Sequence, residues 1–564
     1  MQRFFPVMPT MLTNFPTPLA SAMPEQESSR AGLFPAFLFF FLLFFGLFFS
    51  ILSKNEGTFT YTQDASYIRL ALAGRISHGD YGVNAGEFAA PVSSILWPFL
   101  LSPLASAPIG LFFPLTLNFL ASIGTLFIFH EFIQRSLRDV DQKKRAFFHP
   151  LLLIFLIPVT QLTGLAFTGM EHSLQLFLTA IFFFGLVRYE ETHSPPWWFC
   201  LAIFLGPLVR YENLALSIPA VFFLGIRKHH MIFFVTSLCF LVPIAIFSFF
   251  LYSHDFSVLP TSITDNLLSL PFLSNEGAQG TLFTNLLENL SNRQGAILAL
   301  FSSIFFIFSL RTRENETCSQ ERWVAAFAAF GGFSILLAGK IGCFSRYEIF
   351  LWGNFPVLLL WVLREKITEF LNKEPPYKAI CAGFAVFFSA SLPYIMTTFA
   401  VPTAAHNIFG LPYQLHRFIR EYYRAPVAIN DLGLAVYAND AYVLRLPGLP
   451  SKEALKAWPP EAIGGAKTMG TTEKTRTQRG SGECMNSMAH EKGVSLAMVF
   501  PNIFSEIPAN WKLLGKLVFS DPRIVSANEA ILFYALDDQV IPRVNALLDV
   551  FASSLPSCTR FEKN

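Results

Sequence analysis

The chain has 564 residues, of which 53% are hydrophobic and 14% charged, with 65 phenylalanines and a formal net charge of +2. Globular proteins carry about 25% charged residues, so this composition excludes an ordinary soluble enzyme and predicts a polytopic α-helical membrane protein. The sequence has no basic cluster interleaved with aromatic residues, which argues against a nucleic-acid partner.

The first apolar run, Leu33–Leu52, contains no charged residue. At about 1.5 Å per residue it matches a hydrocarbon core of roughly 30 Å. The run ends at polar residues instead of a small-residue cleavage site, so we expect an uncleaved signal anchor. Residues 1–32 are rich in Pro, Ser and Met and show no apolar periodicity. We expect them to form a cytoplasmic tail.

Further apolar runs continue to residue 400, and they predict a transmembrane domain over residues 33–400. They lie near 93–133, 147–168, 172–188, 197–226, 231–252, 295–310, 323–339, 347–363 and 378–399.

Basic residues in the short loops indicate the orientation. Four clusters lie at 135–145, 227–230, 311–322 and 364–373, and the positive-inside rule places all four in the cytoplasm. The run 93–133 then crosses once, beside a proline-broken partial piece, and 197–226 forms a short hairpin. About 11 crossings result. The alternative, with two full helices in 93–133, keeps the odd total but leaves the strongest cluster outside.

On this topology, charged residues collect on the outer face. Charges near the membrane edge are costly unless they line a wet cavity, so their convergence indicates a functional site. The outer segments are the first external loop at 53–92, then 169–172, 210–213, 253–293 and 340–348.

Residues 401–564 are polar and contain no run long enough to span a membrane. We expect a soluble extracytoplasmic α/β domain with strands in the runs 426–437, 441–446, 494–500 and 530–535. The polar stretch 464–480 is expected to be an insertion. Two cysteines of this domain, Cys484 and Cys558, form either a disulfide or two free thiols, and the sequence leaves both readings open.

Asp64 follows the first span and precedes a predicted helix in which Ile68, Leu72 and Ile76 form an apolar stripe. The stripe predicts that this helix lies on the membrane surface. From the pattern alone, Asp64 is first of all a helix N-cap.

Several short motifs follow one another in a specific order. Besides the stretch 60–97 around Asp64, they are Gly169-Met-Glu171, Leu208-Val-Arg-Tyr-Glu-Asn213, Val258-Leu-Pro-Thr-Ser262, and Asn430-Asp-Leu-Gly-Leu-Ala-Val-Tyr437 with Leu446-Pro-Gly-Leu449. Together they resemble the GT-C superfamily of membrane glycosyltransferases that use polyprenyl-phosphate sugars. The order is most similar to the group of mycobacterial terminal arabinofuranosyltransferases.

The sequence departs from that group at three positions. Gln63-Asp64 stands where the family usually has two adjacent acids, Arg445 stands where it tends to have Asp, and Tyr211 replaces the usual Pro. Only one carboxylate therefore remains in the first-loop motif.

The resemblance implies that Asp64 is the general base that deprotonates an acceptor hydroxyl, which then displaces polyprenyl phosphate with inversion. The leaving phosphate needs cationic partners, for which the candidates are Arg346, Lys340 and Arg210. Candidates for positioning the substrate are Arg69, His78, Glu87, Glu171 and Glu212. No metal site is demanded, and a divalent cation held by Asp64 and one distant acid stays open.

We therefore expect a glycosyltransferase of the plasma (inner) membrane that moves a sugar from a polyprenyl-phosphate donor to an envelope glycan, lipid or protein acceptor. Two alternatives remain. One is a transporter or flippase of a lipid-linked saccharide, a class that usually shows inverted repeats. The other is a catalytically inactive scaffold, suggested by the missing second acid.

Overall fold

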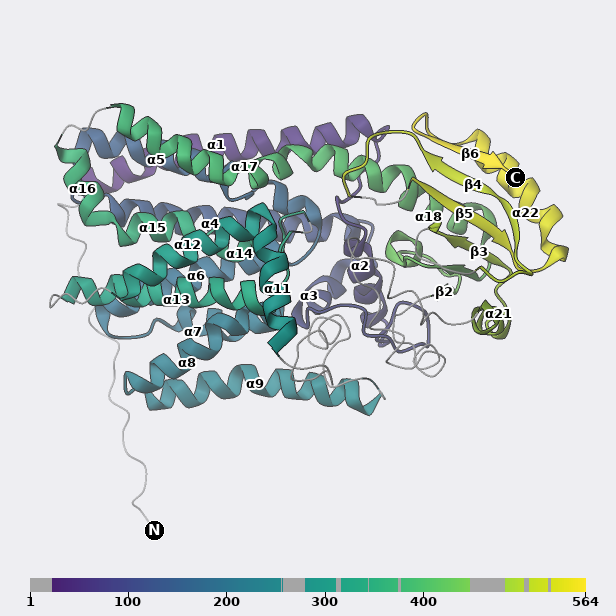
Figure 1. The fold of residues 1–564 in the computed structure, drawn as a ribbon, viewed down its shortest axis with the longest axis horizontal. Coiled ribbons are helices and arrows are strands. Elements are labelled where there is room, and N and C mark those ends of the chain that lie inside the picture. The colour runs from purple at the N-terminus through teal and green to yellow at the C-terminus, as the bar shows by residue number, and fades with distance from the viewer. Residues whose placement is uncertain are drawn as a thin grey trace, which may run out of the picture.

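A computed structural model describes the chain except for residues 1–22, 255, 257–278, 311–315, 343, 374–376, 447–481, 502–506 and 526–528. Long helices run side by side, and a mixed sheet lies at one end of them (Figure 1). The helices before the sheet are α1 (Met23–Lys54), α2 (Ala65–Ile76), α3 (Leu96–Ala105), α4 (Phe113–Ser136), α5 (Gln142–Val159), α6 (His172–Thr192), α7 (Trp197–Val209), α8 (Leu214–Ile226), α9 (His230–Ser253), α11 (Gln279–Ser291), α12 (Arg293–Ser309), α13 (Glu316–Ala338), α14 (Ile349–Trp352), α15 (Phe355–Val362), α16 (Arg364–Asn372), α17 (Tyr377–Ile408) and α18 (Gln414–Arg417).

The polytopic helical architecture is as expected, but the number of spans is not. Within the described ranges, 7 helices are long and apolar enough to cross a membrane, or up to 8 if the bent pair α11 and α12 is one span. The expectation of about 11 was wrong because several apolar runs fold as helices of only 10–17 residues. At about 1.5 Å per residue these are shorter than the hydrocarbon core.

The runs 93–133 and 197–226 fold as the charge-based topology predicts, the first with one long helix beside a short one and the second as a short hairpin. The run 93–133 contains one short helix, α3, and one long helix, α4, of 24 residues, not two full helices. The run 197–226 splits into α7 and α8, which contact each other and are joined by the turn Tyr211–Asn213.

The outward faces of the long helices fit a lipid environment. Large apolar side chains on α9 are strongly exposed, among them Met231 at 77% and Phe249 at 71%, and α1 and α17 show the same feature at Phe34 and Phe399. Exposed apolar surface of this extent needs a lipid or protein cover.

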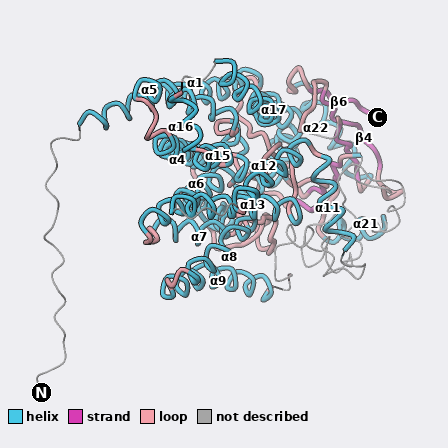
Figure 2. The backbone as a smooth tube through the Cα atoms, turned by 60° about the vertical axis from the view of Figure 1, so that its left-hand side comes forward, coloured by secondary structure: helices cyan, strands magenta, loops and turns pink. Residues whose placement is uncertain are grey.

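Helix α16 and the loop before α5, which carry two of the basic clusters, lie at the end of the bundle opposite the sheet (Figure 1). Lys144, from the 135–145 cluster, donates to the Leu371 carbonyl oxygen of α16 at 2.6 Å. Arg227 pairs with Glu190 at 2.9 Å. Figure 2 shows the strands near the C-terminus, with α5 and α16 away from them.

The C-terminal region forms a six-stranded sheet in the order β2-β1-β3-β5-β4-β6. β1 is parallel to β2 and β3, and the remaining pairs are antiparallel. Helix α22 (Ile541–Ser553) packs on it, and α21 (Gly482–Glu491) precedes β3. The strands are β1 (Val427–Ile429), β2 (Val443–Arg445), β3 (Leu496–Val499), β4 (Lys512–Phe519), β5 (Ala530–Ala535) and β6 (Thr559–Lys563).

The four predicted strand runs contain β1, β2, β3 and β5, whereas β4 and β6 were missed. β4 carries two lysines and a register irregularity between Leu513 and Gly515, and β6 is a charged edge strand. Neither pattern has the continuous apolar run of a buried strand. The expected insertion at 464–480 lies outside the described residues.

Cys558 is a buried free thiol whose sulfur lies 3.6 Å from the Thr559 hydroxyl. The side chain of Cys484, its suggested partner, lies outside the described part of the chain.

Helix α2 lies between the bundle and the sheet domain (Figure 1). Leu70 packs in the bundle core. Of the predicted stripe, Ile68 packs against the core of the sheet domain, Leu72 is fully buried and Ile76 is half-buried. The apolar stripe of α2 therefore faces protein, and the expectation of a helix lying on the membrane surface was wrong. Periodicity reports an apolar face without saying what covers it.

Candidate active site

Asp64 occupies the N-cap position of α2, but its side chain does not cap that helix. Its Oδ1 instead accepts a hydrogen bond from the Leu434 amide of the sheet domain at 2.8 Å. The carboxylate also fills the space that a Cβ on Gly433 would need. Asp64 thus joins the first external loop to a residue 370 positions away in sequence.

An acid of the sheet domain, Asp431, lies near this carboxylate. Burial, together with the neighbouring Asp431 carboxylate, raises the pKa of Asp64 well above its ordinary value, and the Leu434 amide opposes that rise. Asp431 itself is exposed, yet surrounding protein raises the pKa of its carboxyl and the Arg445 guanidinium opposes the rise. The site therefore contains two carboxylates, although the first-loop motif supplies one.

Asp431 is held in place by the residue before it. Asn430 follows β1, donates to the Phe500 carbonyl oxygen at 3.0 Å and accepts from the Phe500 amide at 3.0 Å. These two bonds tie the ends of the parallel strands β1 and β3 together. Asn430–Tyr437 belongs to a motif that resembles the family, but the motif by itself predicts no role for Asp431. A signal was present, since an acid directly after a strand is a common site residue.

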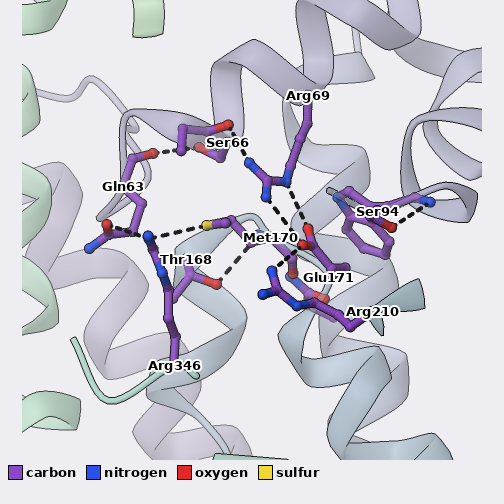
Figure 3. A network of polar contacts seen from close by, with 12 residues as sticks. Gln63, Ser66, Arg69, Ser94, Thr168, Met170, Glu171, Arg210 and Arg346 are labelled. Carbon is purple, nitrogen blue, oxygen red and sulfur yellow. Dashed lines mark hydrogen bonds and ion pairs between the residues drawn. The ribbon is translucent and has the colours of Figure 1, made fainter. Parts of the chain in front are cut away.

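A second polar network lies beside Asp64 and is centred on the fully buried Glu171 (Figure 3). Its carboxylate accepts from Arg69 Nε at 2.7 Å and Nη2 at 3.1 Å, and from Arg210 Nη1 at 2.9 Å. Arg210 also forms a two-pronged ion pair with Glu212. We call these four residues the buried clamp.

The clamp has balanced charge, with two guanidinium groups and two carboxylates. Burial alone would raise the pKa of Glu171, but Arg69 and Arg210 outweigh it and hold the pKa below its usual range. Both carboxylate oxygens of Glu171 accept hydrogen bonds from these arginines. The arrangement therefore suits a rigid support for the external loops better than direct contact with substrate. The positioning roles of these residues stay predictions.

Arg346 differs from the clamp arginines. Its Nη1 donates to Gln63 Oε1 at 2.7 Å and lies 3.3 Å from the sulfur of Met170, as Figure 3 shows. Its guanidinium lies 5.0 Å from the centroid of the Tyr347 ring. In the described ranges no carboxylate lies within ion-pair distance of Arg346, so none of the described acids neutralises its positive charge.

The loop that carries Arg346 is fixed by a buried acid. Glu348 is fully buried and accepts from the Gly342 amide at 3.0 Å. Burial raises the pKa of Glu348 to about 7, and the Gly342 hydrogen bond opposes the rise. This hydrogen bond joins a residue before Arg346 to a residue after it, and so restrains the loop that carries Arg346.

His172 lies buried beside these residues, although the sequence predicted no role for it in the site. It is fully buried, and neither ring nitrogen has a hydrogen-bond partner among the described residues. Its ring lies 6.2 Å from that of Tyr347, which is also contacted by Arg346. An unpartnered buried imidazole is costly, and it faces the same tyrosine as the uncompensated arginine.

Three predicted site residues lie apart from this centre. Lys340 is exposed after α13. His78 is exposed beyond the end of α2 and its Nδ1 lies 2.8 Å from the Gly74 carbonyl oxygen. Glu87 accepts from Asn84 at 2.8 Å, and Asn84 donates to the Val443 carbonyl oxygen at 3.1 Å. Glu87 therefore supports the docking of the loop onto β2.

In the part of the chain that the structure describes, no group of three or more His, Cys, Asp or Glu side chains could hold a metal ion. A cation held by Asp64 and a second acid stays untested, although Asp431 now shows that a distant acid lies beside Asp64.

Comparison with known proteins gives a family match in the sheet domain. Residues 405–534 match a family described as a domain of unknown function (DUF8728). The matched part contains Asp431, Gly433 and Arg445, and it ends within β5, before α22 and β6. No match to a curated protein was found.

Proposed function

We propose that this protein is an integral membrane glycosyltransferase that uses a polyprenyl-phosphate sugar as donor. The observation that carries the proposal is that two consecutive residues of the first external loop hold an acid and contact a cation. Asp64 is a half-buried carboxylate with a raised pKa, and its neighbour Gln63 binds Arg346, whose charge the described protein leaves uncompensated. A base and an anion-binding group are what displacement of a phosphate by a hydroxyl requires.

Gln63 now has a physical role that is compatible with activity. An acid at this position would form an ion pair with Arg346 and reduce its charge. The neutral amide holds the guanidinium at 2.7 Å without neutralising it. The departure from the family pattern therefore supports phosphate binding by Arg346, and it weakens the scaffold alternative.

The reaction follows from these positions. Asp64 takes the proton of the acceptor hydroxyl while the acceptor oxygen forms a bond to the anomeric carbon of the sugar. The bond from that carbon to the phosphate oxygen breaks, and its electron pair leaves with the polyprenyl phosphate. Arg346 stabilises the charge that develops on the phosphate. The resemblance implies inversion at the anomeric carbon.

The orientation proposed for the chain places the sheet domain and this site outside the plasma membrane. Support comes from α16 and the loop before α5, which carry two of the basic clusters and lie at the opposite end of the bundle. A lipid-linked donor would reach the site from the bilayer. The acceptor, an envelope glycan, lipid or protein, would approach on the side of the sheet domain.

The test is transfer by the purified full-length protein in lipid vesicles, with a panel of radiolabelled polyprenyl-phosphate sugars and envelope acceptors. Asp64→Asn should lose about 10²- to 10⁴-fold in rate, the usual contribution of a general base. Asp80→Asn is the matched control, because Asp80 belongs to the same loop and has only a 3.4 Å contact with the Gly86 amide.

Unchanged transfer by Asp64→Asn would overturn the general-base role. If the folded wild-type protein moves intact lipid-linked sugar across the vesicle without transferring it, the enzyme proposal fails and the flippase alternative takes its place.

A further inference from the structure

The sheet domain meets Asp64 at a distinctive edge. The strand order β2-β1-β3 means that the chain leaves β1 to one side and later returns to its other side. Both neighbours of β1 are parallel to it, so the carboxyl ends of β1 and β3 form a topological switch point, where ligands of open α/β sheets bind. Asn430 bridges these ends through Phe500, and Asp431 comes next.

We propose that Asp431 is the second carboxylate of the active site, delivered by the sheet domain instead of the first external loop, and that it acts on the reaction through Asp64. This inference rests on the proposed function, because it assigns a partner to the base of that reaction. Asp431 is a positioning residue in this proposal.

The first support is geometric. Asp64 is bound to the turn Gly433–Val436 through the Leu434 amide, and Gly433 leaves room for its carboxylate. Asp431 lies two residues before the first residue of this turn. The two acids therefore approach one short backbone segment from the membrane domain and the sheet domain.

The second support is the rigidity of both sides. Asn430 fixes the chain before Asp431 with two hydrogen bonds to Phe500. On the other side, Asn84 donates to and accepts from the backbone of Val443, each at 3.1 Å, and so ties the external loop to β2. The pair is thus held by the fold at the place where the two domains join.

The charged and titratable groups around the pair come from several elements. Arg445, at the end of β2, lies near Asp431. Tyr67 of α2 lies near Asp64. His416 of α18 and Tyr437, after the turn, lie beside the same segment, and both lie near Arg420. Arg346 reaches the residue before Asp64.

Two close carboxylates titrate as a pair, because ionisation of one makes ionisation of the other harder. An ionised Asp431 therefore makes Asp64 a stronger base than an isolated aspartate. The neutral Gln63 contributes no such charge, so the acid missing from the loop motif is supplied in space by Asp431.

The experiment is an infrared pH titration of the purified full chain, which follows the band of protonated carboxyl groups. The titration midpoint that disappears in Asp64→Asn is assigned to the Asp64–Asp431 pair. Asp431→Asn should lower the remaining midpoint of Asp64 by about one pH unit or more, the order produced by a neighbouring charge. Arg445→Gln should move the upper midpoint of the pair in the opposite direction, because the pair loses its cation.

Transfer activity is measured in parallel. The acidic limb of the pH–rate profile should move to lower pH in Asp431→Asn and return toward the wild-type position in Asp431→Glu. Asp440→Asn is the control, since Asp440 is an exposed acid of the same domain. It should change neither the titration nor the profile.

The outcomes separate the two proposals. An unchanged midpoint in both Asp431→Asn and Arg445→Gln overturns the role of Asp431, whatever the activity. Shifted midpoints without transfer from any donor support the coupled pair and refute the glycosyltransferase proposal. If Asp431→Asn does not fold, Arg445→Gln is the deciding variant. An upward shift of the upper titration midpoint then supports the coupling of Asp64 and Asp431, and an unchanged midpoint refutes it.

Discussion

The substitution Glu171→Gln tests whether the buried clamp supports the site. Glu171 is fully buried and accepts three hydrogen bonds from Arg69 and Arg210. Glutamine has nearly the same size but no charge and a single acceptor oxygen. The change leaves two buried guanidiniums opposed by Glu212 alone, so one positive charge in the clamp becomes uncompensated.

Removing one partner of a buried ion pair costs about 3–5 kcal/mol, because the other charge stays buried. The remaining amide oxygen of glutamine can still accept from one arginine, so the lower end of this range applies. We expect the free energy of unfolding to fall by about 3 kcal/mol.

The assay is chemical denaturation of the purified protein in detergent, followed by tryptophan fluorescence. Glu191→Gln is the matched control, because Glu191 pairs with Arg135 and Arg188 but all three side chains are 25–38% exposed. A pair of this kind contributes about 0–1 kcal/mol. Equal effects of the two substitutions would refute the assignment of the clamp as a buried support.

Three further expectations follow from the site. Gly433→Ala places a methyl group where the Asp64 carboxylate lies, at a residue whose φ is +24°, so transfer should fall at least tenfold and the melting temperature should fall as well, because alanine is strained at positive φ; wild-type activity would contradict this contact. Arg346→Gln should weaken donor binding more than Lys340→Gln, measured as KM for the lipid-linked sugar, because only Arg346 belongs to the network beside Asp64; equal effects would remove Arg346 from the phosphate site. Glu348 has a folded pKa of about 7, above the ordinary value of about 4.3, so its ionisation destabilises the fold as pH rises through that interval. Glu348→Gln should therefore gain stability relative to wild type as pH rises from about 4.3 to about 7 in denaturation curves, and a constant difference would contradict the raised pKa.

Much of the helical architecture was predictable because hydropathy is a local property. A window of about 20 residues shows whether a segment can lie in lipid, and α1, α4, α6 and α9 each lie in a predicted apolar run. The number of crossings was overestimated, because apolar runs such as 347–363 fold as helices shorter than a membrane span. The edge strand β6 was missed because its sequence is charged and has no continuous apolar run.

The candidate site was predictable only in part. The order of motifs singled out Asp64, Glu171 and Arg210, and the predicted outer segment 340–348 added Arg346. The fold brings the last three, with Arg69, into adjoining networks. Lys340, His78 and Glu87 have the right chemistry, but their side chains lie apart from those networks. The unpartnered ring of His172 is visible only once its neighbours are known.

The sequence by itself determined that the chain is a helical membrane protein, that its polar motifs follow the apolar runs, and that a polar α/β region closes the chain. Only the tertiary structure decided that Asp64 binds the Leu434 amide and lies beside Asp431, and that Gln63 faces Arg346. The reason is physical. Apolar content acts through each segment separately, whereas the proximity of two carboxylates depends on how α2 packs against a turn 370 residues away.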